Sequence, residues 1–157
     1  MRKLVKWLVR IVVVVVVVVG VLFAAVYVLS EQRMAKVYAI EPAVPPVPGD
    51  PDAVERGAHV AAIRGCRDCH GKDMGSATFI DDPLFARLSG PNLTPAGPGG
   101  KFSDVELVRA IRHGVGKDGR SLLFMPSQEF SHRRAEDPGG RLASLHRLPA
   151  VDKTRPE

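Results

Sequence analysis

The feature that most constrains this chain is a long apolar run near its N-terminus. Residues 11–29 are 19 consecutive uncharged residues, and positions 12–19 are all valine. As a helix the run would span ~28 Å at ~1.5 Å per residue, which matches the hydrocarbon core of a bilayer. A helix satisfies its own backbone polar groups in lipid, so the membrane overrides the middling helix propensity of valine. The run therefore predicts a transmembrane anchor over residues 11–29.

The charges around this run predict its orientation. Four basic residues precede it and only two follow it closely, which places residues 1–10 in the cytoplasm and the rest of the chain outside. A cleaved signal peptide is the alternative. Its apolar core usually runs about 7–15 residues and ends at a small-x-small site, which residues 24–30 do not offer. Both interpretations export the remaining chain.

Composition shifts divide the exported part. Residues 30–51 include five prolines between positions 41 and 51, so we expect an extended, semi-rigid tether that holds the next domain away from the membrane. Residues 52–152 have the length of one small domain, and residues 153–157 form a short tail. Charge is mixed in residues 52–157, with 16 basic and 14 acidic residues that alternate. No concentrated basic face is expected, which argues against nucleic-acid binding.

Local patterns predict a mainly helical domain. Residues 52–64 form a short helix after Pro51, with apolar residues at 54, 58, 61 and 62. Residues 71–100 are rich in Gly, Pro, Asp and Ser, and we expect a long loop there. A capping box from Ser103 to Glu106 begins a helix that Gly114 ends. No strand alternation stands out, so the predicted fold class is all-α.

The motif that carries chemistry is C-x-x-C-H, formed by Cys66, Cys69 and His70. Two thiols three residues apart on one turn can each add to a vinyl group of a porphyrin, and the adjacent imidazole can reach the iron. The motif thus predicts one covalently attached haem c, with His70 as an axial ligand.

The motif has three other interpretations. A thioredoxin-like redox pair expects alternating strands and helices, which are absent from the pattern. A zinc site needs a fourth ligand at suitable spacing, since His70 supplies only a third. A plain disulfide is the last alternative. The chain has only these two cysteines, and the motif lies in an exported domain followed by a loop of suitable character, which favours haem.

The residues alone leave the sixth iron ligand open. Met125 lies in a short apolar segment 55 residues after His70, where a methionine is as readily a core residue as a ligand. Among the other histidines at 59, 113, 132 and 146, His113 at the end of the capped helix is the most plausible. Its alternative role is a cation that interacts with the helix dipole.

From residue 49 to about residue 152 the chain resembles class I c-type cytochromes, and within them a bacterial group of membrane-anchored monohaem proteins. The segments that carry the resemblance are residues 66–70, 90–94, 108–114 and 124–127. The resemblance implies that Met125 and His70 are the axial ligands of the haem iron. It also implies that the Pro91 carbonyl accepts a hydrogen bond from the His70 ring and that Leu93 packs on the porphyrin.

Methionine and histidine ligation implies a function. A soft thioether favours Fe(II), and two strong ligands leave no vacant position for a substrate. We therefore expect a non-enzymatic carrier of single electrons on the outer, periplasmic side of a bacterial cytoplasmic membrane. Its partners would be a dehydrogenase, a quinol-oxidising complex or an oxidase. The alternatives are a haem sensor or peroxidase-like protein with an open sixth position, and the cytochrome subunit of a larger dehydrogenase.

The chain departs from this resemblance over residues 133–147. Glycines at 139 and 140 stand where the apolar first turn of a C-terminal helix is expected, and Ser144 takes the place of an aromatic residue that would pack near Gly57. A compensated reading-frame shift and simple divergence both account for the difference. Two interior glycines cost about 1 kcal/mol each relative to alanine, so we expect weak packing between the first and last helices of the domain.

Overall fold

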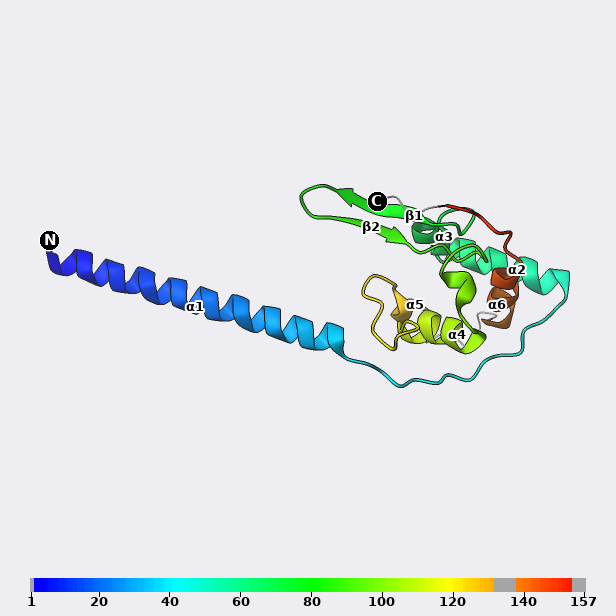
Figure 1. The fold of residues 1–157 in the computed structure, drawn as a ribbon, viewed down its shortest axis with the longest axis horizontal. Helices are drawn as coiled ribbons and strands as arrows, with labels where there is room; N and C mark the ends of the chain where they lie inside the picture. The colour runs from blue at the N-terminus through cyan, green and yellow to red at the C-terminus, as the bar shows by residue number, and fades with distance from the viewer. Residues whose placement is uncertain (1, 132–137, 154–157) are drawn as a thin grey trace.

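In a computed structural model, residues 2–131 and 138–153 are described. The elements in chain order are α1 (Arg2–Ala35), α2 (Pro51–Ile63), α3 (Cys66–His70), β1 (Ala77–Asp82), β2 (Ala86–Gly90), the 3-10 turn η1 (Gly99–Lys101), α4 (Asp104–His113), α5 (Ser127–Ser131) and α6 (Pro138–His146). Figure 1 shows α1 as a single long helix projecting from a domain built by the other elements. Within the described residues, α1 alone is long and apolar enough to cross a membrane.

The proline-rich segment after α1 is extended, but it does not hold the domain away from the helix. The backbone N–H of Tyr38 donates to the carbonyl of Gly119 at 2.8 Å, and Arg147 donates to the carbonyl of Gly49 at 3.4 Å. The chain from 36 to 50 thus runs along the domain surface, as Figure 1 shows. The segment expected to be a semi-rigid tether is thus extended, and its backbone groups find partners on the domain.

Helix α2 packs against α6 through small residues. Its first turn is capped by Asp50, whose carboxylate accepts the backbone N–H of Ala53 at 2.8 Å. The buried residues of α2 are Ala53, Gly57 and Ala61. This buried face is rotated slightly from the predicted one, which comprised positions 54, 58, 61 and 62. A Cβ atom on Gly57 would overlap the carbonyl of Gly140, so the two backbones meet where the helices cross.

Helix α6 forms in the stretch where we expected weak packing. Leu142 and Ala143 are 1% and 3% exposed, and Gly140 lies at the crossing with α2. The expected weakness concerns stability and stays a prediction, while the geometry shows the two backbones meeting closely at Gly57 and Gly140. The part of the divergent segment at positions 133–137 lies outside the described residues.

The all-α prediction is wrong between residues 71 and 100, where β1 and β2 form an antiparallel hairpin. A bulge between Thr78 and Ile80 breaks the simple alternation that identifies a strand in a sequence. At the turn, the Asp82 carboxylate accepts the backbone N–H groups of Leu84 and Phe85 at 2.8 and 3.0 Å. Asp82 thus stabilises the turn of the hairpin, whereas the composition of residues 71–100 had suggested a long loop.

The capped helix predicted after Ser103 is confirmed as α4. Ser103 and Glu106 form the reciprocal capping box, and Gly114 ends the helix with a φ of 63°. The hydroxyl of Ser127 donates to the carbonyl of Ala110 at 3.2 Å, which holds α5 against α4. This contact positions the segment between the two helices, where Met125 lies.

Replacing Gly57 by alanine tests the helix crossing. We expect Gly57→Ala to lower the free energy of unfolding by about 1–2 kcal/mol, because the overlap with the α6 backbone outweighs the gain in helix propensity. Gly49→Ala is the matched control, since a Cβ there meets nothing within 4 Å. Chemical denaturation of both variants provides the measurement. Equal stabilities would show that the backbones do not meet as described.

Candidate functional site

The two cysteines and the histidine of the motif lie on α3, a helix bounded by glycines in left-handed or otherwise positive-φ conformations. Gly65 before it has a φ of 73° and Gly71 after it has a φ of 84°. Glycine adopts such angles at little cost, so the chain can turn sharply out of α2 and directly into the motif. Cys66 and Cys69 are both free thiols and both line one cavity, together with His70.

The imidazole of His70 is held by a backbone carbonyl. Its Nδ1 atom lies 2.8 Å from the carbonyl oxygen of Pro91, in the arrangement of an N–H donor and its acceptor. Pro91 follows β2 directly, so the hairpin that the sequence did not reveal is what brings this carbonyl to the ring. Because Nδ1 donates to the Pro91 carbonyl, Nε2 is the ring nitrogen left to bind a metal in the cavity.

The hairpin approaches α3 closely at Gly90. A Cβ atom on Gly90 would overlap the carbonyl of Cys69, so no larger residue fits without moving β2 away from the motif. The hydroxyl of Ser76 donates to the Gly90 carbonyl at 2.7 Å and fixes the same strand end. These contacts set the position of the Pro91 carbonyl relative to His70.

Burial favours the neutral forms of Cys66 and His70. It raises the pKa of the Cys66 thiol, and the charge of Arg141 opposes part of that rise. It lowers the pKa of the His70 imidazole, and the hydrogen bond to Pro91 opposes part of that decrease. A neutral imidazole is the form that binds a metal. The site therefore presents His70 in the state that ligation needs.

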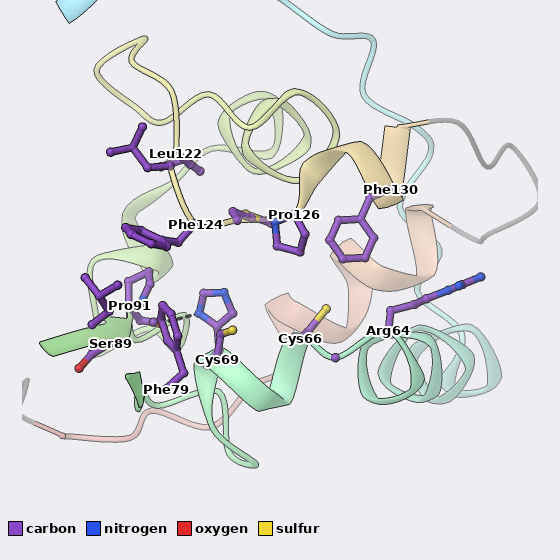
Figure 2. Close-up of a pocket in the computed structure, with 16 residues that line it drawn as sticks. Arg64, Cys66, Cys69, Phe79, Ser89, Pro91, Leu122, Phe124, Pro126 and Phe130 are labelled. Carbon is purple, nitrogen blue, oxygen red and sulfur yellow. Dashed lines mark hydrogen bonds between the residues drawn. The ribbon is translucent and has the colours of Figure 1, made fainter. Parts of the chain in front are cut away.

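The wall facing α3 is apolar. Met125 and its neighbours in the segment between α4 and α5 line it, and the Phe79 ring on β1 lies 6.2 Å from the Phe124 ring, centroid to centroid. Figure 2 shows Phe79, Phe124 and Phe130 on different sides of the space that the two thiols face. The lining residues are Arg64, Gly65, Cys66, Cys69, His70, Phe79, Leu88, Ser89, Gly90, Pro91, Leu122, Leu123, Phe124, Met125, Pro126 and Phe130.

Leu93 lies elsewhere. It lines a second hollow with Leu107 of α4 and Leu145 of α6, and it is not among the described residues that line the cavity of His70. The structure thus brings together five of the six predicted site residues and places Leu93 behind them.

His59, His113 and His146, the other histidines that the structure describes, do not line the cavity. His59 and His113 are exposed, and His146 pairs with Asp104 at 2.8 Å. His132 lies outside the described residues. Across residues 2–131 and 138–153, no group of three or more His, Cys, Asp or Glu side chains is arranged to hold a metal ion. The fourth ligand that a zinc site would need is not found among these residues.

A buried polar cluster supports the site, and sequence analysis missed it. Thr94 is fully buried, and both its backbone N–H and its hydroxyl lie within 2.8 Å of the Asn92 side-chain oxygen. The Asn92 amide donates to the carbonyl of Val151 at 2.7 Å, and the Val151 N–H lies 3.1 Å from the Thr94 hydroxyl. The cluster ties the segment after Pro91 to the C-terminal end of the domain.

Three relatives share part of this sequence, while no family model matches it. The chain is 35% identical over 98 residues to the cytochrome c subunit of quinone alcohol dehydrogenase from Gluconacetobacter polyoxogenes and to that from Komagataeibacter europaeus. It is 37% identical over 91 residues to a subunit of the nicotinate dehydrogenase of Pseudomonas putida.

These similarities cover 55% of this chain and 21% of each alcohol dehydrogenase subunit, and 53% of this chain and 8% of the nicotinate dehydrogenase subunit. The chain thus spans about a fifth of the length of the first relatives. About half of it is similar to the cytochrome c subunits of two quinone alcohol dehydrogenases and to a subunit of a nicotinate dehydrogenase.

Removing the Thr94 hydroxyl tests the buried cluster. We expect Thr94→Val to lower the free energy of unfolding by about 1–3 kcal/mol, because it removes the buried hydroxyl that bonds to the Asn92 side-chain oxygen and to the Val151 N–H. Thr78→Val is the matched control. Its hydroxyl pairs with Ser89 at a partly exposed position, so a loss of about 0.5–1 kcal/mol is expected. Equal losses in a denaturant titration would contradict a special role for the cluster.

Proposed function

We propose that this chain is a membrane-anchored, monohaem c-type cytochrome that passes single electrons between redox proteins. One observation carries the proposal. Cys66, Cys69 and His70 line one wall of an apolar cavity, and Met125 lines the same cavity from a different segment of the chain. This set of thiols, imidazole and thioether is the donor set that haem c uses.

The residues of the cavity suit that group. Cys66 and Cys69 lie one helical turn apart, as addition to two vinyl groups requires. The Pro91 carbonyl occupies Nδ1 of His70 and leaves Nε2 for the iron. Apolar and aromatic side chains form most of the lining, which suits the face of a porphyrin. A haem c bound here would supply a one-electron Fe(III)/Fe(II) couple.

The protein groups have separate roles in this proposal. Cys66 and Cys69 hold the cofactor covalently, and Pro91 fixes the ring orientation of His70 and raises its basicity. The thioether of Met125 would be a second donor to the metal and would favour its reduced state. Phe79 and Phe124 supply part of the apolar lining of the cavity. With His70 and Met125 both bound to it, the metal would supply one-electron transfer and would have no place for a substrate.

A dehydrogenase is the electron donor that the comparisons favour. The relatives are named as subunits of alcohol and nicotinate dehydrogenases. We propose that this chain receives electrons from such an enzyme, either as a mobile carrier or as its permanent cytochrome subunit. Purification from native membranes separates the two: a permanent subunit remains with a dehydrogenase after mild solubilisation, and a carrier does not.

We further propose that α1 anchors the protein in the bacterial cytoplasmic membrane, with the domain on the periplasmic side. Its apolar run exceeds a usual signal-peptide core, and the basic residues gather before it. A tethered carrier stays near its membrane partners at a raised effective concentration. N-terminal sequencing of the mature protein checks this, since an intact Arg2 end is expected and a start near residue 30 would contradict it.

Visible and near-infrared spectra test the ligand set. We expect a low-spin spectrum with a methionine-to-iron band in the oxidised protein and no response of the reduced protein to CO. Met125→Ala should abolish the band and open the metal to CO. Met74→Leu is the matched control, because Met74 is buried outside the cavity. A parent protein that binds CO would instead support the sensor or peroxidase-like alternative.

A further inference from the structure

Two large apolar side chains stand exposed at the turn of the β1–β2 hairpin. Leu84 is 99% exposed and Phe85 is 79% exposed. The turn that carries them is well built, because Asp82 accepts both of their backbone N–H groups. Immediately below it, Asp81 and Arg87 form an ion pair at 2.7 Å. The two side chains are therefore presented by a structured turn, and they lie outside the cavity described above.

The chain leaves little distance between the apolar run and the domain. The run ends at residue 29 and α1 continues to Ala35, which adds ~9 Å at ~1.5 Å per residue. Two residues later Val37 pairs with Arg120, and the Tyr38 N–H donates to Gly119. The domain is thus bound to the end of the membrane helix, and the surface around Gly119 must lie near the lipid headgroups.

The hairpin turn is on that same side of the domain. In Figure 1 the turn between β1 and β2 points in the direction in which α1 extends, and so does the loop that follows α4. The start of α2 lies at the opposite end of the domain. The turn that carries Leu84 and Phe85 is therefore on the side from which the membrane helix arrives.

We infer that Leu84 and Phe85 insert into the interface of the bilayer that α1 crosses, as a second membrane contact of the domain. This inference rests on the anchoring role of α1 in the proposed function. Aromatic and aliphatic side chains favour the membrane interface, and a tip already tethered beside it loses little further freedom on binding. The Asp81–Arg87 pair reduces the net charge next to the tip, which eases its approach to lipid.

This contact would orient the cavity. Phe79 of β1 packs against Phe124, and both line the cavity. A hairpin held at the membrane therefore holds one cavity wall at a defined orientation to the bilayer. Two attachment points, α1 and the hairpin tip, would restrict the rotation that a single tether allows.

Spin labels on the full-length holoprotein in phosphatidylcholine and phosphatidylglycerol vesicles test the inference. With Cys66 and Cys69 bonded to haem, a single added cysteine is the only thiol, and mass spectrometry of the labelled chain verifies this independently. Pro83→Cys places a nitroxide at the tip, Glu55→Cys places one on exposed α2, and Val15→Cys places one within α1. Frequent collisions of the nitroxide with oxygen indicate that it lies in lipid. Frequent collisions with a water-soluble nickel chelate indicate that it lies in water.

We expect the oxygen-to-nickel collision ratio at position 83 to exceed that at position 55 several-fold. Adding Leu84→Ser and Phe85→Ser should lower the collision ratio at position 83 to that at position 55. Exchanging the two residues, as Leu84→Phe with Phe85→Leu, should keep the nitroxide at position 83 in lipid. A tip as water-accessible as position 55, with position 15 in lipid, would overturn the inference and leave the anchor standing. A water-accessible position 15 would overturn both.

Discussion

The contact between the backbones of α2 and α6 is the interaction on which the rest of the domain depends. Gly57 lies against the Gly140 carbonyl, and no side chain separates the two helices there. Because α2 turns at Gly65 directly into α3, the crossing also sets where the motif lies. Helix α6 in turn places Arg141 over the Phe130 ring, 5.9 Å from its centroid, at the edge of the cavity.

The site is assembled from segments that are distant in the sequence. α3 contributes two thiols and an imidazole, the end of β2 contributes the carbonyl that orients the ring, and the segment before α5 contributes Met125. Each segment is held by backbone contacts, namely Gly90 against Cys69 and Ser127 against Ala110. A rigid set of donors is what low-reorganisation electron transfer requires, since the ligands must keep their places when the charge of the metal changes.

Local patterns predicted the parts of the fold that local interactions stabilise. The capping box of α4, the start of α2 after Asp50 and the C-x-x-C-H spacing all act within a few residues. The hairpin was missed because its strands are short, half-buried and interrupted by a bulge. The bonds from Asn92 and Thr94 to Val151 join positions more than 50 residues apart, so no local pattern reports them. The contacts of the α6 glycines were not predicted, because Gly139 meets the Pro46 carbonyl and Gly140 meets Gly57, both distant in the sequence.

The intact mass of the denatured protein tests the haem assignment most directly. The chain would be produced in a bacterium that attaches haem to exported proteins, purified from its membranes and unfolded before measurement, so that only covalent groups remain. We expect the mass of the chain plus one haem, with neither Cys66 nor Cys69 open to alkylation. A chain without added mass, whose two cysteines are alkylated or joined in a disulfide, would contradict the assignment of this site to haem c.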